Sequence, residues 1–246
     1  MHPVLFQLGP VAFYTYGLFV ALGMTAAYAV SMRRAKSAGI PKQVVTDALL
    51  LFFISGVAGA RAFFVWQHFD DYKENIWQIF SVHEGGLVWY GGFLTAGALG
   101  VLYGRTRHWP ILKLADFFAP QLALGHAIGR IGCFFNGCCF GRVTLGPLGA
   151  YFSGGPQPRH PVQLYESALL FLLSLYLFWF SKKKRFREGN VFLMYVILYS
   201  VLRFFLEFLR GDQTAVFFLT LPQWTSLILF GGSSSLYLWP GKNAKV

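Results

Sequence analysis

Two apolar stretches of the chain carry arginines where a membrane segment tolerates charge least. Arg203 and Arg210 flank Glu207 within residues 191–210, and Arg130 lies in a second such stretch. A charged side chain at the centre of a bilayer costs about 2.5–3.5 kcal/mol on insertion scales, so it usually faces a partner or a polar cavity. The arginines therefore predict a site for an anion inside a membrane protein, with a lipid phosphate as the first candidate.

Four polar residues of the stretch 191–210 recur at the spacing of one helix face. Tyr199, Arg203 and Glu207 follow one another at intervals of four residues, and Arg210 lies seven residues after Arg203. Such spacings place side chains on one side of an α-helix. We expect Glu207 to orient one arginine while the other binds a ligand. The alternative is an internal ion pair that only locks helices together.

The stretch around Arg130 combines small residues with polar ones. Gly125 and Gly129 form a GxxxG pair, and Gly132 follows on the next turn. Such small residues let a neighbouring helix approach closely. His126 lies one turn before Arg130 on the same face. The chain then leaves the membrane through Asn136 and a glycine, which suits an irregular turn whose backbone lines a polar pocket.

Two further features lie earlier in the chain. Tyr90 precedes two glycines, so it is open to whatever approaches; an interfacial aromatic is the simpler interpretation. Gly92, Ala96 and Gly100 predict a helix-packing strip of small residues. Arg61 lies close to the end of its apolar stretch, where its side chain either reaches the interface or joins the site.

Composition identifies an integral membrane protein. Of the 246 residues, 55% are hydrophobic and 13% charged, against roughly 25% charged in soluble domains. The net charge of +11 lies mostly in short loops between apolar stretches, which is a topological pattern and not a nucleic-acid-binding one. We expect one transmembrane domain spanning residues 1–246, with its first apolar run retained as a span and not cleaved as a signal peptide.

The fold class predicted is an all-α polytopic membrane bundle of seven transmembrane helices. The loops after the first, third and fifth spans and the C-terminal tail hold most of the basic residues, whereas the loop after the second is net acidic. The positive-inside rule then places the N-terminus outside and the C-terminus in the cytoplasm. The predicted spans are 11–32, 45–66, 86–104, 114–135, 162–180, 190–210 and 222–239.

The cysteines do not form a recognised metal motif. Cys133, Cys138 and Cys139 are too few for a disulfide framework, and they lack CxxC spacing. We expect small thiols packed among glycines, with a disulfide from Cys133 to one of the pair as an alternative.

Several segments, taken in order along the chain, resemble prolipoprotein diacylglyceryl transferases. The most specific is Gly129-Arg-Ile-Gly-Cys-Phe-Phe-Asn-Gly137, which is similar to the family signature. The family has seven spans with the N-terminus outside, as the charge pattern predicts here. The other segments are Tyr16-Gly17, Gly85–Gly92, Ala115–Pro120, Pro158–Glu166, Arg203–Arg210 and Leu221–Ser226.

The resemblance implies an enzyme of a bacterial inner membrane. The family transfers the sn-1,2-diacylglyceryl group of phosphatidylglycerol to the thiol of the lipobox cysteine in a prolipoprotein, so a thioether forms and glycerol phosphate leaves. No metal or organic cofactor is required. By family match, Arg130 and Arg203 bind the phosphate and stabilise the leaving group. The match also assigns the shape of the site to Tyr16, Asn136, Tyr199, Glu207 and Arg210.

Two positions depart from the family pattern. Many members have His, the usual general-base candidate, where this chain has Tyr90, and neutral tyrosine is a poor base near neutral pH. The candidate bases are Tyr90, with its pKa lowered by neighbouring arginines, and His126 or His160 in its place. The alternative is that the arginines stabilise the thiolate and make a base unnecessary. Many members also carry Asn and Glu where Cys133 and Cys138 stand, so any role of that Glu is absent or is supplied elsewhere, with Glu166 as one candidate.

These departures leave two alternatives to the transferase. One is a paralogue with a different lipid or acceptor. The other is a non-catalytic phospholipid-binding membrane protein, which would use the arginines and ignore Tyr90.

Overall fold

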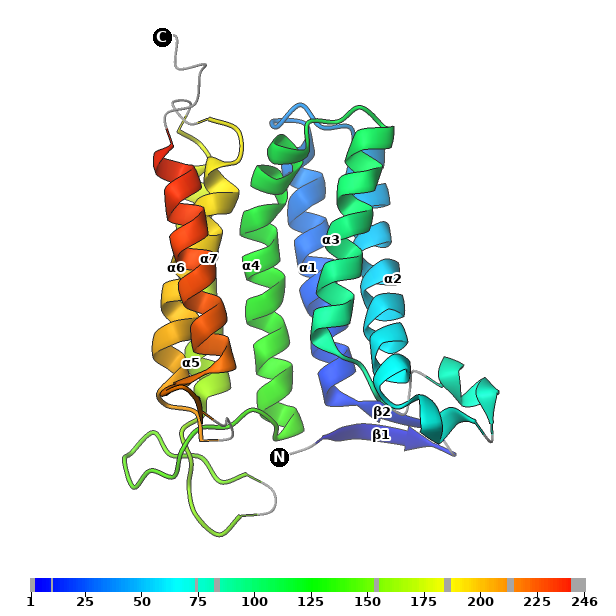
Figure 1. The fold of residues 1–246 in the computed structure, drawn as a ribbon, viewed down its shortest axis with the longest axis vertical. Coiled ribbons are helices and arrows are strands. Elements are labelled where there is room, and N and C mark those ends of the chain that lie inside the picture. Colours follow the sequence, from blue (N-terminus) through cyan, green and yellow to red (C-terminus); the bar gives the residue numbers. More distant parts are fainter. Residues whose placement is uncertain are drawn as a thin grey trace. The chain divides into compact units, whose positions relative to one another are not determined.

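A computed structural model describes residues 3–9, 11–73, 75–81, 85–152, 155–183, 187–211 and 215–239. Its described part is dominated by helices (Figure 1). The long helices are α1 Thr15–Ala35, α2 Lys42–Gln67, α3 Trp89–Thr106, α4 Ile111–Asn136, α5 Val162–Phe180, α6 Asn190–Glu207 and α7 Leu221–Leu238. Two short 3₁₀ helices, η1 Phe69–Tyr72 and η2 Ile76–Phe80, follow α2.

The helical membrane fold agrees with the prediction from sequence. Each predicted span corresponds to one long helix, and α1, α2, α5 and α6 are long and apolar enough to cross a membrane by length and composition. That search covered only the described residues, and the seven-span topology with its orientation remains a prediction.

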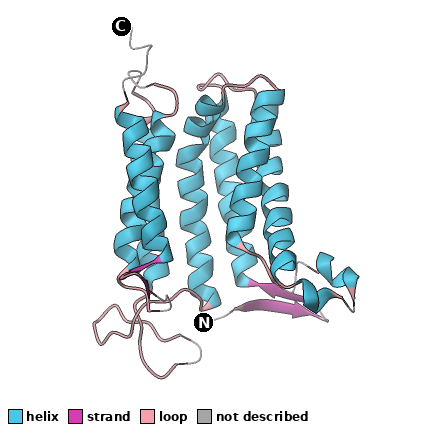
Figure 2. Ribbon diagram, viewed as in Figure 1, coloured by secondary structure: helices cyan, strands magenta, loops and turns pink. Residues whose placement is uncertain are grey.

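Strand is confined to two short antiparallel hairpins in the described chain (Figure 2). Strand β1 Val4–Leu8 pairs with β2 Val11–Tyr14, and β3 Ala215–Val216 pairs with β4 Leu219–Thr220. The prediction that the first span begins at residue 11 was therefore wrong, because residues 11–14 are extended and the helix starts at Thr15. Hydropathy does not distinguish an apolar strand of this length from the first turn of a helix.

The chain forms two compact units, of which the first comprises Met1–Val30 and Ala115–Val246. Its core lies where α4, α5 and α6 pack together. Alanines on one face of α4 let the larger side chains of the other two helices approach. The buried members are Ala119, Ala123, Ala127, Leu170, Leu173, Leu177, Phe180, Val191 and Tyr195.

Glycines bring α1 close to α4 in this unit. A Cβ added to Gly23 would lie 2.7 Å from the carbonyl oxygen of Gly125, and one added to Gly132 would lie 2.8 Å from Phe19 Cβ. Gly129 has no atom within 4 Å of such a Cβ. The close face is thus Gly125 with Gly132, two turns apart. The predicted close approach is confirmed at these two glycines and is wrong at Gly129.

Serines of α5 fasten that helix to α4. Ser167 donates a hydrogen bond of 2.7 Å to the carbonyl of Ala127, and Ser174 donates one of 2.8 Å to the carbonyl of Pro120. Interhelical hydrogen bonds of this kind stabilise membrane bundles by about 1 kcal/mol each. They fix the position of α5 along α4.

A carboxylate of α4 caps the N-terminus of α6. Asp116 Oδ2 accepts a hydrogen bond from the amide of Gly189 at 2.7 Å, and Oδ1 accepts one from the amide of Phe192 at 2.8 Å. The local cap residue Gly189 supplies no side chain for this purpose. First-turn amides need an acceptor, and a negative charge there complements the helix dipole. Asp116 therefore fixes the start of α6 relative to α4.

The second unit is Ser31–Leu114, in which α2 packs against α3. A Cβ added to Gly92 would lie 2.7 Å from the carbonyl oxygen of Gly56, and the side chain of Ala96 also faces Gly56. Gly100 has nothing within 4 Å of such a Cβ. The predicted strip is confirmed at Gly92 and Ala96 and is wrong at Gly100, where α3 no longer lies against α2 so closely.

Arg61 is a structural residue of the second unit. It is buried, and its guanidinium donates hydrogen bonds of 2.6–3.2 Å to the backbone carbonyls of Gln78, Ile79, Gly85 and Gly86. A buried guanidinium needs this many acceptors. Arg61 thus holds the loop between α2 and α3. Of the two alternatives considered from the sequence, a side chain that reaches solvent at the interface is excluded by this burial.

We expect Asp116→Ala to destabilise the protein by about 1–2 kcal/mol, since it leaves two amides of α6 without acceptors. Denaturant titration in detergent, followed by circular dichroism, measures the change. Asp70→Ala is the matched control, because the Asp70 side chain is 86% exposed and pairs only with Lys73 at the surface. Equal stability of the two variants would show that Asp116 does not act as a cap.

Candidate functional site

The buried carboxylate of Glu166 joins three helices of the first unit. Glu166 lies in the first turns of α5 and is 1% exposed. Arg130 of α4 forms an ion pair with it through Nη2 and donates a further hydrogen bond from Nε to Oε2 at 2.8 Å. Tyr199 of α6 donates its hydroxyl to Oε1 at 3.1 Å, and His126 Nε2 lies 3.8 Å from the same oxygen.

This arrangement brings together His126, Arg130 and Tyr199, which the sequence suggested as two separate groups. Glu166 itself was considered only as a replacement for a carboxylate that the family signature usually carries. One signal pointed to it: Glu166 is an acidic residue near the start of an apolar stretch of membrane length.

A second buried carboxylate, Glu207, faces two arginines. Arg203 Nη2 lies 2.8 Å from Glu207 Oε2, and Arg210 Nε lies 4.0 Å from that oxygen. Thr220, at the start of α7, donates its hydroxyl to Oε1 at 3.0 Å. The helical spacing thus predicted the cluster correctly. The expectation that Glu207 orients only one of the two arginines differs from the structure, where both lie within 4.0 Å of its carboxylate.

Arg130 and Arg203 each keep one guanidinium nitrogen without a strong hydrogen-bond acceptor. Arg203 Nη1 is buried and has no hydrogen-bond partner among the described residues. Arg130 Nη1 meets the thiol of Cys133 at 3.8 Å, and a thiol is a weak acceptor. Their side chains are 16% and 13% exposed, respectively. Buried donors without partners are uncommon in proteins, so these nitrogens point to a ligand with acceptor oxygens.

Tyr16 and Asn136 lie at the same end of α1 and α4. Tyr16 is in the first turn of α1 and is half-exposed; a Cβ added to Gly132 would lie 3.4 Å from its Cα and Cδ2. Asn136 is the last residue of α4 and is partly buried. Because Arg130 lies less than two turns before that end of α4, both residues lie near Arg130.

The three cysteines are free thiols in the turn that follows α4. Cys133 is buried, and Cys138 Sγ donates to its carbonyl at 3.6 Å. Gln163 of α5 donates its side-chain amide to the carbonyl of Cys138 at 2.5 Å, which ties the turn to α5. The disulfide considered from sequence is not formed. Across the described ranges, no group of three or more His, Cys, Asp or Glu side chains could hold a metal ion.

Two other candidate bases have different surroundings. Tyr90 is in the first turn of α3, in the second unit, and is 46% exposed. Its catalytic role stays a prediction. His160 lies in the loop before α5, and its Nδ1 is 3.3 Å from the hydroxyl of Tyr165 in α5. Of the histidines considered as bases, His126 is thus the one beside the Arg130–Glu166 pair.

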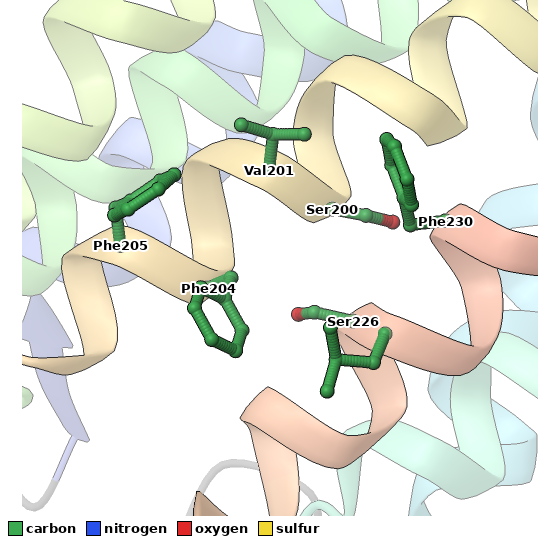
Figure 3. Close-up of a pocket in the computed structure, with 7 residues that line it drawn as sticks. Ser200, Val201, Phe204, Phe205, Ser226 and Phe230 are labelled. Atoms are coloured by element: carbon green, nitrogen blue, oxygen red, sulfur yellow. The ribbon is translucent and has the colours of Figure 1, made fainter.

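An apolar cavity of about 150 Å³ lies between α6 and α7 (Figure 3). Ser200 and Ser226 face each other across it, and aromatic rings form much of its remaining wall. Arg203 follows Ser200 by one turn of α6, so the cavity adjoins the Glu207 cluster along that helix. The lining residues are Ser200, Val201, Phe204, Phe205, Ser226, Leu227 and Phe230.

Comparison with known proteins gives a consistent result over most of the chain. The family model described as prolipoprotein diacylglyceryl transferase matches residues 3–239. A phosphatidylglycerol–prolipoprotein diacylglyceryl transferase of Clostridium tetani is 37% identical over 92% of this chain and 93% of the relative. A protein of that name numbered 2, from Clostridium perfringens, is 34% identical over 96% and 94%. One from Idiomarina loihiensis is 37% identical over 92% and 88%.

We expect Glu166→Leu to destabilise the protein by about 3–5 kcal/mol, because it leaves the Arg130 guanidinium buried without its counter-charge. The double variant Arg130→Met with Glu166→Leu should recover most of this loss, since it removes both charges. Denaturant titration in detergent measures all three proteins. A double variant no more stable than Glu166→Leu alone would contradict the pairing.

Proposed function

Because the chain belongs to the prolipoprotein diacylglyceryl transferase family, we propose that it transfers the sn-1,2-diacylglyceryl group of phosphatidylglycerol to a cysteine thiol of prolipoproteins. The acceptor thiol is that of the lipobox cysteine. A carbon–sulfur bond forms at the sn-3 carbon of the lipid and the carbon–oxygen bond to the phosphate breaks. The electron pair leaves with glycerol phosphate, and the thiol proton is released.

The observation that carries this proposal is the pair of incompletely satisfied guanidinium groups on α4 and α6. Arg203 Nη1 is buried without a partner in the described chain, and Arg130 Nη1 has only the Cys133 thiol at 3.8 Å. Phosphate oxygens are strong acceptors for guanidinium donors. Donors held in place before the reaction stabilise the charge that develops on the leaving phosphate.

The charge balance of the cluster suits a phosphodiester. Arg130, Arg203 and Arg210 carry three positive charges against the two carboxylates of Glu166 and Glu207, which leaves one positive charge. The phosphate of phosphatidylglycerol carries a single negative charge. A ligand of that charge completes the site without leaving an unpaired ion in a region of low dielectric constant.

The acceptor must be a thiolate, because the neutral thiol is a poor nucleophile. We propose that Tyr90 acts as the base in its ionised form and receives the thiol proton, and that the arginines favour the thiolate by their charge. Tyr16, Asn136 and Tyr199 shape the site, with Glu207 and Arg210 completing the lipid-binding group. His126, 3.8 Å from Glu166, is the alternative base.

The cavity between α6 and α7 supplies room for hydrocarbon next to these charges. Its wall is made of phenylalanine, leucine and valine side chains with two serines. We assign to it one segment of an acyl chain of the donor lipid. A headgroup at Arg203 and a chain beside Ser200 would place the two parts of the lipid one helical turn apart along α6.

The proposal includes the membrane topology. Seven spans, an outside N-terminus and a cytoplasmic C-terminus in the bacterial inner membrane would present the end of α4 that carries Asn136 to the side on which exported prolipoproteins emerge. The distribution of basic loops supports this orientation. The family model covers residues from both compact units, which supports a single functional domain over residues 1–246.

We expect Arg130→Ala and Arg203→Ala each to lower the transfer rate by about 100-fold or more, since each removes a donor to the leaving phosphate. Purified protein in detergent is supplied with phosphatidylglycerol and a lipobox peptide, and mass spectrometry detects a peptide heavier by one diacylglyceryl group. Arg105→Ala is the control, because Arg105 is exposed in the second unit.

Full activity of either site variant would refute the assignment. Absence of any adduct from the wild type, with phosphatidylglycerol still bound in an Arg130-dependent way, would instead favour a paralogue with another acceptor or a lipid-binding protein.

Tyr90→Phe tests the base directly. We expect it to lower kcat by about 100-fold, because general-base catalysis contributes that much or more. Tyr90→His should retain activity and move the rise of the pH–rate profile to lower pH, since histidine titrates nearer neutral pH than tyrosine. An unchanged kcat for Tyr90→Phe would move the search to His126.

A further inference from the structure

The hairpin between α6 and α7 has an unusual turn. Ala215–Val216 pairs with Leu219–Thr220, so Phe217 and Phe218 occupy the two turn positions. Their φ angles are 50° and 69°, which is the left-handed region at both positions. Two-residue hairpins with positive φ at both positions are type I′ turns, and they strongly favour Asn and Gly.

Neither the backbone nor packing within the described part of the chain explains two phenylalanines here. A bulky residue with positive φ is strained, because its Cβ approaches the backbone too closely. Phe217 is 83% exposed and Phe218 fully exposed, so no described part of the chain compensates by burying their rings. The aromatic side chains need a partner outside the chain.

The hairpin lies at an end of the membrane-spanning helices. It follows α6, which is long and apolar enough to cross a bilayer, and leads directly into α7 (Figure 1). Trp224 of α7 donates its indole N–H to the carbonyl of Val216 at 3.0 Å, so the hairpin is attached to the first turn of that helix. Tryptophan is typical of the bilayer interface.

Exposed apolar side chains connect this tip with the side of α7. Val216 and Leu221 are 48% and 58% exposed, and Ile228, two turns farther along α7, is 71% exposed. On a helix of a membrane protein such residues face hydrocarbon. Exposed apolar side chains therefore recur from α7 to the Phe217–Phe218 tip.

We propose that the Phe217–Phe218 tip is a membrane anchor that inserts into the bilayer leaflet at this end of α6 and α7. The partner is lipid, and burial of both rings in the interface compensates the strain of the turn. The same hairpin ends at Thr220, whose hydroxyl donates to Glu207 at 3.0 Å. The anchor thereby holds the carboxylate that orients Arg203 and Arg210.

The double substitution Phe217→Asn with Phe218→Gly distinguishes the contribution of the backbone from that of the membrane. It should stabilise the turn itself and remove the contact with lipid, so the two contributions change hairpin stability in opposite directions. Asn-Gly is favoured in this turn, so a hairpin held by its backbone alone would open less often in the variant. A hairpin held by lipid would open more often. We expect hydrogen exchange of the 215–220 segment in phosphatidylglycerol-containing nanodiscs to be about ten-fold faster in the variant, as burial of a phenylalanine supplies such a factor.

Leu145→Asn is the matched control, since it removes a 94% exposed apolar side chain from another loop. It should leave exchange of the hairpin unchanged. The thermal unfolding temperature of the double variant in detergent should be at least as high as that of the wild type. Such a result excludes misfolding as the cause of faster hydrogen exchange. Exchange in nanodiscs that is equal or slower in the variant overturns the anchor.

The position of the ring can also be measured with 4-cyanophenylalanine in place of Phe218, read by its nitrile stretching frequency in nanodiscs. The same probe at Phe171, exposed at mid-length of α5, gives the lipid value, and the free amino acid in buffer gives the water value. A lipid-like frequency supports the anchor. A water-like frequency overturns it. A frequency that shifts to the lipid value only after a lipobox peptide is added also overturns it, and would assign the tip to docking of the acceptor.

Discussion

Two carboxylates buried among apolar helices determine how the candidate site is built. An arginine inside a membrane bundle needs a counter-charge at close range, because the surroundings do not screen it. Glu166 serves Arg130, and Glu207 serves Arg203 and Arg210. Glu166 orients the Arg130 guanidinium and Glu207 orients that of Arg203, while Nη1 of each arginine is left without a strong acceptor in the described chain. A membrane protein can hold a phosphate this way without exposing it to water.

The packing of the first unit serves these two pairs. Glu166 can reach Arg130 only if α5 lies close against α4, and the alanine face of α4 with the bond from Ser167 to Ala127 provides that closeness. Tyr199 reaches Glu166 only if α6 has the correct height, which the Asp116 cap sets from the other end of the helix. Small residues and interhelical hydrogen bonds therefore position the groups of the candidate site from outside the site itself.

Local spacing predicted much of this, and long-range pairing did not follow from it. The Arg203–Glu207 pair lies within one helix, so its geometry is fixed by the helical repeat. The Arg130–Glu166 pair joins residues 36 positions apart on different helices, and no periodicity indicates which helices are neighbours. The same limit explains Arg61: its acceptors are carbonyl groups of a loop, which have no sequence signature. Strand β2 was missed because hydropathy treats a few extended apolar residues as part of a span. The second hairpin lies between two predicted spans, in a stretch too short for a strand pattern to be recognised.

The Asp116 cap makes the position of Arg203 depend on the number of residues in α6 that precede it. From Gly189, where the cap is made, to Arg203 there are fourteen residues, or about 21 Å of helix at 1.5 Å each. Adding one residue between them would rotate Arg203 by about 100° relative to the capped start of the helix. Mutation can therefore change the composition of this segment but not its length. Insertions and deletions in descendants of this chain should collect in the loops, because the length of a loop does not set the position of a residue along α6.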